Sequence, residues 1–219
     1  MSDSESNLQV RSPLSERLDA LARAAHPGLR AACRRITAGD ELALTPAELR
    51  PLERAVDKVR RASGAARIVA RTLLAKLGAP PDVELPRSAS RAPVWPPGFV
   101  GSLAHDDDYA AAAVARSDSL RGVGIDIEPA LPLPEGLLKT IATRSEMKQI
   151  NGDLALARLI FCVKEAVYKA THPIDGVFLA HHDVEVSLAS SVAVTRTGHR
   201  LRLHTIARPR LVALALLAT

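Results

Sequence analysis

The chain has 219 residues, of which 47% are hydrophobic and 24% are charged, the proportions of an ordinary globular protein. This size allows one or two compact domains, and this composition excludes a disordered, collagen-like or disulfide-stapled protein. The two cysteines, Cys33 and Cys162, have no partners at metal-ligand spacing, which excludes a Cys/His zinc site. No apolar run reaches the roughly 20 residues that cross a bilayer, and the N-terminus lacks the pattern of a secretion signal, so we expect a cytoplasmic protein.

The charge is unevenly distributed along the chain. The net charge is +5, and the basic excess lies before Ala92, where 16 Lys and Arg stand against 11 Asp and Glu. Such a region can attract an anionic cofactor, an acidic protein or nucleic acid. Aromatic residues make up only 3%, and Cys/His fingers and a basic leucine zipper are missing from the sequence, so we expect no nucleic-acid partner. For any single arginine, a solvated helix surface is the alternative interpretation.

The region before residue 78 has mainly helical patterns. Ser12-Pro13 opens an apolar helical pattern that stops at residues 26–28. Residues 45–48, Thr-Pro-Ala-Glu, have the form of a capping box, with threonine as the N-cap and glutamate three residues after it. The apolar residues between positions 58 and 77 follow helical spacing and predict a further helix. Gly78 and two prolines after it mark its end.

This third helix carries arginines along one of its faces. Their spacing of seven and four residues aligns them: Arg60, Arg67 and Arg71. Such a row of cations faces either solvent or a bound anion, and the spacing alone does not decide between the two.

Strand patterns dominate after a proline-rich loop at residues 86–98. The apolar and alternating runs lie at residues 99–103, 109–115, 123–127, 184–188, 192–195, 201–206 and 211–217. A long helix is predicted over residues 153–170 and is expected to end at His172-Pro173. This order of helices and strands predicts an α+β protein of two stacked halves, residues 1–120 and residues 121–219.

Residues 123–128, Val-Gly-Ile-Asp-Ile-Glu, place two carboxylates on one side of a strand. Because side chains alternate along a strand, Asp126 and Glu128 share one face while the isoleucines take the other. Neighbouring carboxylates repel each other unless solvent, a proton or a cation offsets their charge, and oxygen ligands at this spacing suit Mg²⁺. A metal site and a strand end in solvent are both compatible with this motif.

The helix at residues 153–170 adds a second group of ionisable residues. Glu165 and Lys169 lie four residues apart and share a helix face opposite the apolar face. One interpretation is an ordinary surface ion pair. The other is a third metal-binding carboxylate next to lysines that bind phosphate oxygens.

In order and spacing, four motifs of the sequence resemble those of the 4′-phosphopantetheinyl transferases. Three of them are Gly101–His105, Val123–Glu128 and Phe161–Lys169. The fourth, Arg91–Gly98, narrows the resemblance to the long single-chain type that serves siderophore, nonribosomal-peptide and polyketide synthases. Each motif alone is weak, but together they cover about residues 58–170 in the family's order.

This resemblance implies a fold and a set of roles. The fold is a pseudo-two-fold pair of similar α+β halves, the first binding coenzyme A and the second carrying the metal and catalytic motifs. The implied metal ligands are Asp126, Glu128 and Glu165. The implied catalytic residues are Glu165, as general base, and Lys169, at the leaving phosphate. The residues implied to bind coenzyme A are Arg60, Arg67, Arg91, Ser102, His105, Lys164 and Lys169.

The implied activity is the Mg²⁺-dependent transfer of phosphopantetheine from coenzyme A to a serine of an apo acyl or peptidyl carrier protein, with release of adenosine 3′,5′-bisphosphate. Mn²⁺ suits the same all-oxygen site. Because one chain holds both halves, we expect a monomer. Two alternatives stay open, namely a non-catalytic protein that binds coenzyme A or a carrier protein, and a basic nucleic-acid binder.

Some residues depart from the family pattern or lie outside it. Ala104 stands where serine or threonine is common, and Asp106-Asp107-Asp108 directly follows His105. We interpret this acidic triplet as a solvated turn, with a second cation site as the alternative. We also interpret His181-His182-Asp183 as an exposed turn.

Overall fold

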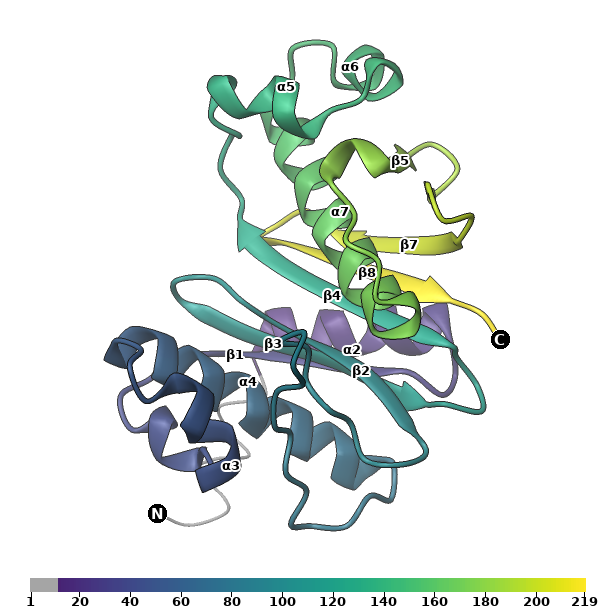
Figure 1. The fold of residues 1–219 in the computed structure, drawn as a ribbon. Helices are drawn as coiled ribbons and strands as arrows, with labels where there is room; N and C mark the ends of the chain where they lie inside the picture. Colours follow the sequence, from purple (N-terminus) through teal and green to yellow (C-terminus); the bar gives the residue numbers. More distant parts are fainter. Residues whose placement is uncertain (1–11) are drawn as a thin grey trace.

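The computed structural model describes residues 12–219, which form two antiparallel sheets, each covered by a long helix (Figure 1). The strands are β1 (Arg30–Arg35), β2 (Phe99–His105), β3 (Tyr109–Arg116), β4 (Gly122–Pro129), β5 (Val184–Ser187), β6 (Val192–Thr195), β7 (Arg200–Ile206) and β8 (Arg210–Leu217). The helices are α2 (Pro13–Ala25), α3 (Pro46–Leu49), α4 (Asp57–Lys76), α5 (Leu138–Ile141), α6 (Arg144–Ile150) and α7 (Leu154–Asp175). None of the helices in this part of the chain is long and apolar enough to cross a membrane.

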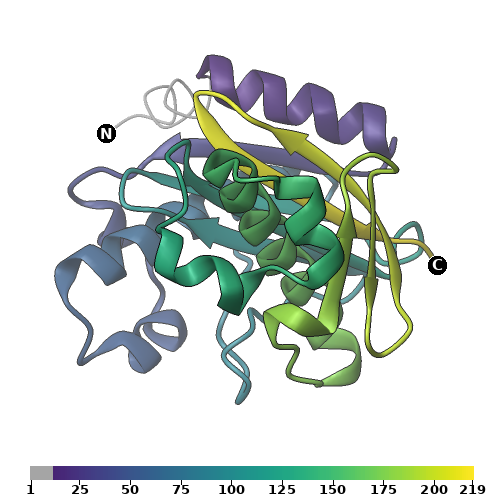
Figure 2. The ribbon, with the colours of Figure 1, turned by 90° about the horizontal axis from the view of Figure 1, so that it is seen from above.

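The sheets and helices stack in four layers. The first sheet has the strand order β1-β3-β2, and the second has the order β4-β8-β7-β6-β5. The helix α4 packs on the outer face of the first sheet, α7 packs on the outer face of the second, and the two inner faces share one hydrophobic core. Figure 2 shows α2 lying along one side of these layers, where it closes the shared core. Each half thus pairs a sheet with a long helix, which confirms the expected α+β class.

The strand β4 separates the shared core from the layer that carries the functional groups. Ile125 and Ile127 are fully buried in the shared core, and Asp126 points to α7, as the alternation predicts. Gly124 also faces α7, where a Cβ atom on it would lie 1.8 Å from the carbonyl oxygen of Ala166. The absence of a side chain at this position therefore lets the backbone of α7 lie directly on β4.

The helix α7 begins as predicted but ends later than predicted. The Asp153 side chain caps its first turn by accepting hydrogen bonds from two backbone N–H groups. The predicted end at His172-Pro173 is wrong, because the helix continues to Asp175. Pro173 lies in the last turn, where its missing N–H removes a single intrahelical bond. Gly176, with a φ of 66°, then caps the helix by donating its N–H to the carbonyl of His172.

The strand β1 lies in a region whose sequence predicted only helices. Its four central residues are buried, some against α4 and the others in the shared core. A strand covered on both faces lacks the alternation of polar and apolar residues that identifies strands in a sequence. The remaining strands, β2 to β8, agree with their predicted ranges to within two residues at each end.

Candidate active site

A cavity of about 520 Å³ opens between α4, β2, the loop before β2 and the last turns of α7. Its lining is made of Ser63, Ala66, Arg67, Arg87, Ser90, Arg91, Ala92, Pro93, Gly101, Ser102, Leu103, Ala104, His105, Tyr168, Lys169, His172 and Pro173. This volume lies within the range of small-molecule and cofactor sites. The structure therefore brings together five residues that the sequence assigned to coenzyme A, namely Arg67, Arg91, Ser102, His105 and Lys169.

The cavity is basic. Its lining includes three arginines, one lysine and two histidines, but no aspartate or glutamate. Three serine side chains add hydrogen-bonding groups that suit phosphate oxygens. A concave site with this composition favours a ligand that carries several negative charges.

Desolvation lowers the pKa of two of these arginines. Burial lowers the pKa of Arg67 to about 10, although the neighbouring Glu48 carboxylate opposes the shift. Desolvation also lowers the pKa of Arg87, and the positive charge of Arg91 adds to that effect. The Arg87 side chain makes no ion pair or hydrogen bond with residues 12–219. A bound anion would offset the repulsion between Arg87 and Arg91.

Asp126 is the most buried of the three predicted metal ligands. Its side chain is 8% exposed, and its Oδ1 accepts a hydrogen bond from Lys169 Nζ at 2.6 Å. Its Oδ2 is buried and has no hydrogen-bond partner within the described part of the chain. Desolvation would lower the pKa of Lys169, but the charge and hydrogen bond of Asp126 raise it overall. Lys169 therefore stays charged, and it joins the basic cavity to the carboxylates on β4.

The other two carboxylates also have basic partners. Glu128 lies 2.8 Å from Arg158 Nη1, and its pKa is raised by burial and then by the negative charge of Asp126. Glu165 Oε1 lies 3.1 Å from His181 Nε2. The histidine belongs to a single 3₁₀ turn, His181–Asp183, in which His182 is exposed as predicted, whereas His181 is half-buried against Glu165.

The donor set suits a hard divalent cation, although it is not gathered around one point. Within residues 12–219, no three His, Cys, Asp or Glu side chains converge closely enough to form a preassembled metal site. Asp126 nevertheless offers a buried, unpaired oxygen, and Glu128 offers a second carboxylate on the same strand face. All three candidates supply oxygen atoms, the ligand type that Mg²⁺ prefers. The residues therefore fit such an ion by their chemistry.

Two predicted coenzyme A ligands lie outside the cavity lining. Arg60, on the first turns of α4, is partly exposed and pairs with Asp57 on the same helix. Lys164 is fully buried, where it forms an ion pair with Glu146 at 2.6 Å and donates to the carbonyl of Ile141 at 2.8 Å. Burial lowers the pKa of Lys164, against the opposing effect of Glu146. The structure thus places both cations with internal partners.

Sequence reasoning did not identify Arg87, Tyr168, His172 or His181 as residues of the site. Tyr168 and His172 lie one helical turn apart on α7, but the predicted helix stopped at residue 170, so only Tyr168 could have been placed beside Lys169 from the sequence. Arg87 precedes Arg91 in the proline-rich loop, whose conformation has no periodic signal.

The acidic triplet after β2 forms a turn with its own partners. Asp106 Oδ1 accepts hydrogen bonds at 2.7 Å from the N–H groups of Asp108 and Tyr109. Arg210 pairs with both Asp106 and Asp108. Asp107 Oδ1 lies 2.8 Å from Nζ of the exposed Lys58. These contacts confirm a turn, but it is solvated only at Asp107 and Asp108, because the Asp106 side chain is buried.

Comparison with known proteins gives matches to both halves of the chain. Residues 46–115 match the family model described as the 4′-phosphopantetheinyl transferase N-terminal domain. Residues 122–214 match the model of the 4′-phosphopantetheinyl transferase superfamily. Among solved structures, the holo-(acyl-carrier-protein) synthase of Thermotoga maritima is similar at 25% identity and a TM-score of 0.37, over 46% of this chain and 64% of that one.

Curated relatives carry the same family name. The chain is 42% identical over 151 residues to the 4′-phosphopantetheinyl transferase Npt of Nocardia iowensis, covering 68% of each chain. It is 38% identical over 146 residues to PptT of Mycobacterium tuberculosis, covering 65% of this chain and 64% of that one. It is 38% identical over 151 residues to Svp of Streptomyces mobaraensis, covering 66% of this chain and 61% of that one. The chain therefore belongs to the 4′-phosphopantetheinyl transferase superfamily, a family of transferase enzymes, as its motifs indicated.

Proposed function

We propose that this protein transfers the phosphopantetheine group of coenzyme A to a serine hydroxyl of an apo acyl or peptidyl carrier protein, releasing adenosine 3′,5′-bisphosphate. The observation that carries this proposal is the position of Lys169, which lines the basic cavity and also donates to Asp126. A polyanionic donor in the cavity would therefore have a phosphate beside the carboxylates of β4. Membership of the transferase family supports the same reaction.

In this proposal the cavity binds coenzyme A through its phosphates. Arg67, Arg87 and Arg91 contact the 3′-phosphate, because they form the arginine-rich end of the lining. Ser102, His105 and Lys169 contact the pyrophosphate, which brings the reacting phosphorus toward Asp126. Charge-assisted hydrogen bonds of this kind are stronger than neutral ones and fix the donor in one orientation.

We propose Asp126, Glu128 and Glu165 as the residues that hold Mg²⁺ or Mn²⁺. When bound, such an ion supplies Lewis-acid stabilisation of negative charge on the pyrophosphate oxygens. The unpaired Oδ2 of Asp126 supports this assignment, and so does the charge repulsion that raises the pKa of Glu128, because a cation would relieve both.

Two side chains of α7 would act in the transfer step: Glu165 would accept the proton of the serine, and Lys169 would offset the negative charge of the leaving phosphate. Glu165 accepts the proton of the serine hydroxyl at a carboxylate oxygen, while His181, 3.1 Å away, holds that carboxylate in place. The serine oxygen bonds to the β-phosphorus, and the bond from that phosphorus to the bridging oxygen breaks. Lys169 offsets the charge on the leaving phosphate, a role that its raised pKa favours.

We further propose that residues 1–120 are mainly the donor-binding half and that residues 121–219 carry the metal ligands and the base. The separation of the two family matches and the change of sheet between Arg116 and Gly122 support this division. Because both halves belong to one chain, we propose a monomer. We also propose that the protein works in the cytoplasm and has no nucleic-acid partner.

Intact-mass spectrometry of an apo carrier protein tests the proposal. Incubation with this protein, coenzyme A and Mg²⁺ is expected to add one phosphopantetheine mass to the carrier, and a chelator is expected to prevent the gain. Coenzyme A binding without any gain of mass on several acyl and peptidyl carriers would indicate a non-catalytic binder instead. Binding to DNA or RNA that coenzyme A does not displace would favour the nucleic-acid alternative.

Coenzyme A affinity is expected to increase as the pH falls from about 8 to about 6. Desolvation and then the charge of Lys169 lower the pKa of His105, so its imidazole is neutral in the free protein near neutral pH. A bound phosphate favours the imidazolium and raises that pKa, so binding takes up a proton and is tighter where protons are more available. Calorimetry in two buffers of different ionisation enthalpy measures both the affinity and the proton uptake.

The variant His105→Gln separates this effect from the titration of the phosphate itself. Most of the pH dependence should disappear in the variant. An unchanged pH dependence would show that a group other than His105 takes up the proton.

A further inference from the structure

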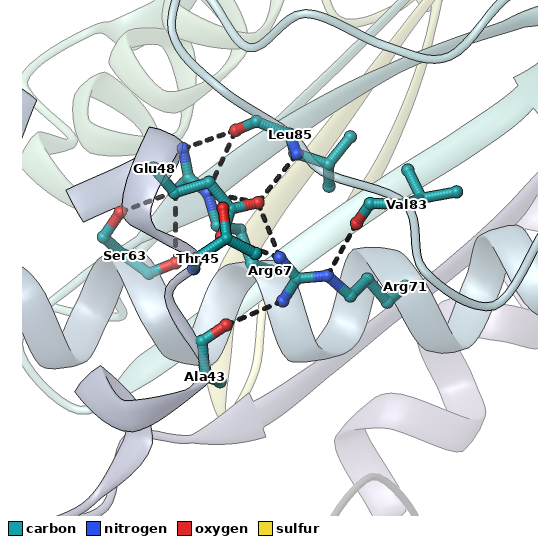
Figure 3. Close-up of polar contacts among 8 residues, drawn as sticks. All are labelled: Ala43, Thr45, Glu48, Ser63, Arg67, Arg71, Val83 and Leu85. Carbon is teal, nitrogen blue, oxygen red and sulfur yellow. Dashed lines mark hydrogen bonds and ion pairs between the residues drawn. The ribbon is translucent and has the colours of Figure 1, made fainter. Parts of the chain in front are cut away.

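A buried carboxylate outside the cavity connects two elements of the cavity wall, the helix α4 and the loop before β2. Glu48, at 0% exposure, accepts hydrogen bonds from Arg71 Nη2 at both of its oxygens, at 2.6 and 2.7 Å (Figure 3). It also accepts from the backbone N–H of Leu85 at 2.7 Å and of Thr45 at 3.0 Å. Arg67 Nε lies 3.4 Å from the same carboxylate. A single side chain therefore connects α3, α4 and the segment at Leu85.

The same cluster fixes the segment that leads into the cavity wall. The carbonyl of Leu85 accepts from Arg67 at 2.8 and 3.1 Å, and the carbonyl of Val83 accepts from Arg71 at 2.8 Å. Residues 81–95 belong to neither sheet, and a small hairpin around the Arg87–Pro93 bridge follows Leu85 directly. The hairpin supplies Arg87 and Arg91 to the lining. Its base is therefore anchored to α4 through Glu48 and the two arginines that Glu48 contacts.

The second half contains a matching arrangement that does not reach the cavity lining. Glu146 is also fully buried, accepts from the N–H of Thr143 at 2.8 Å and from the N–H of Val186 at 2.8 Å, and pairs with Lys164. The carbonyl two residues before the threonine accepts from the helix cation in both halves, Ala43 from Arg71 and Ile141 from Lys164. The motif thus occurs twice, but only the copy around Glu48 supports a donor-binding loop.

We propose that Glu48 is a positioning residue for the donor, because it fixes the Arg67 guanidinium and the base of the hairpin that carries Arg87 and Arg91. This inference rests on the proposed function of the cavity as the coenzyme A site. Glu48 is not itself a lining residue, but it contacts the lining residue Arg67, so its effect is on the arrangement of the arginines. Removing its charge leaves the buried guanidinium of Arg67 and the partly buried guanidinium of Arg71 without their carboxylate, so both groups are expected to form new contacts.

The variant Glu48→Gln tests this proposal, because glutamine keeps the volume and one acceptor but loses the charge. We expect the dissociation constant of coenzyme A, measured by calorimetry, to rise at least about tenfold, since small displacements of binding groups have large effects. The KM for coenzyme A should rise in parallel while kcat at saturation changes little. Hydrogen exchange in residues 86–94 should become faster in the absence of any ligand.

Glu146→Gln is the matched control, since it removes the same kind of buried charge from the other half. It should lower the thermal stability to a similar extent but leave coenzyme A affinity and exchange in the hairpin unchanged. If Glu48→Gln does not fold, Arg71→Lys is the milder variant, because Arg71 anchors the carboxylate without lining the cavity. It should change affinity and exchange in the same direction.

Two outcomes would overturn the proposal. One is wild-type hairpin exchange and coenzyme A affinity in the folded Glu48→Gln variant. The other is an equal loss of affinity in both glutamine variants, which would indicate general destabilisation. A wild-type protein that fails to bind coenzyme A would instead refute the proposed function, and hairpin exchange would still test the positioning role.

Discussion

Replacing Asp126 with asparagine is expected to lower the rate of phosphopantetheine transfer by at least about a thousandfold. The amide carries no negative charge, so it cannot pair with Lys169 and is a poor ligand for Mg²⁺. Donor binding should persist, because Asp126 does not line the cavity. The measurement combines the mass-based transfer assay with calorimetric titration of coenzyme A. Thermal unfolding should show a folded variant, since asparagine has nearly the same volume as aspartate.

Asp118→Asn provides the matched control for this variant. Asp118 lies on an exposed turn, where Arg116 is its ion-pair partner among residues 12–219, and its loss should leave transfer unchanged. Near-wild-type transfer by Asp126→Asn at limiting Mg²⁺ would exclude Asp126 as a metal ligand. Loss of coenzyme A binding together with transfer would instead move Asp126 into the donor site.

Gly124→Ala is expected to destabilise the fold by about 3 kcal/mol or more, at the upper end of overpacking effects. The new methyl group would lie 1.8 Å from the carbonyl oxygen of Ala166 and 2.9 Å from the backbone nitrogen of Ala170. Both atoms belong to the backbone of α7, so no rotamer change can relieve the contact. For a domain of this size such a loss lowers the melting temperature by roughly 6–12 °C. Calorimetry or circular dichroism measures the shift.

Gly136→Ala separates this clash from the general effect of replacing glycine. No atom lies within 4 Å of a Cβ built on Gly136, and its φ is not in the left-handed region. The control should therefore change stability by less than about 0.5 kcal/mol. A Gly124→Ala protein as stable as this control would show that α7 can move away from β4 at little cost. In that case transfer should still fall, because Lys169 would move away from Asp126.

Much of the fold follows from local patterns in the sequence. The alternation in β4 predicted that its isoleucines and Asp126 lie on opposite faces, and the structure agrees, with the isoleucines in the shared core and Asp126 toward α7. The predicted start of α7 at residue 153 is also confirmed, because the Asp153 side chain caps its first turn. The two failures have different causes. β1 is buried on both faces and therefore lacks a periodic pattern, whereas α7 tolerates Pro173 because Gly176 caps the turn that contains it.

The site was only partly predictable, because a motif identifies residues without giving the direction of their side chains. Lys164 and Lys169 belong to one motif, but residues five apart on a helix differ by about 140° in direction. One of them lies in the cavity lining, and the other is buried against Glu146. Arg60 and Arg67 share a direction but are about 10 Å apart along the helix axis, so the cavity reaches only Arg67.

The strand pairing of β4 indicates the order in which the arginine-rich wall and the carboxylate strand fold. The first sheet has all its strands once the chain has reached Arg116, so the arginine-rich wall can form early during synthesis. In contrast, β4 has a single hydrogen-bonded neighbour, β8, which pairs Gly122 with Leu217 across nearly a hundred residues. Such a contact of high sequence separation forms late. A nascent or proteolysed chain without β8 would therefore lack a fixed strand for Asp126 and Glu128, and it would also lack the β8 side chains of the shared core. Under the proposed function, such a chain could not modify a carrier protein.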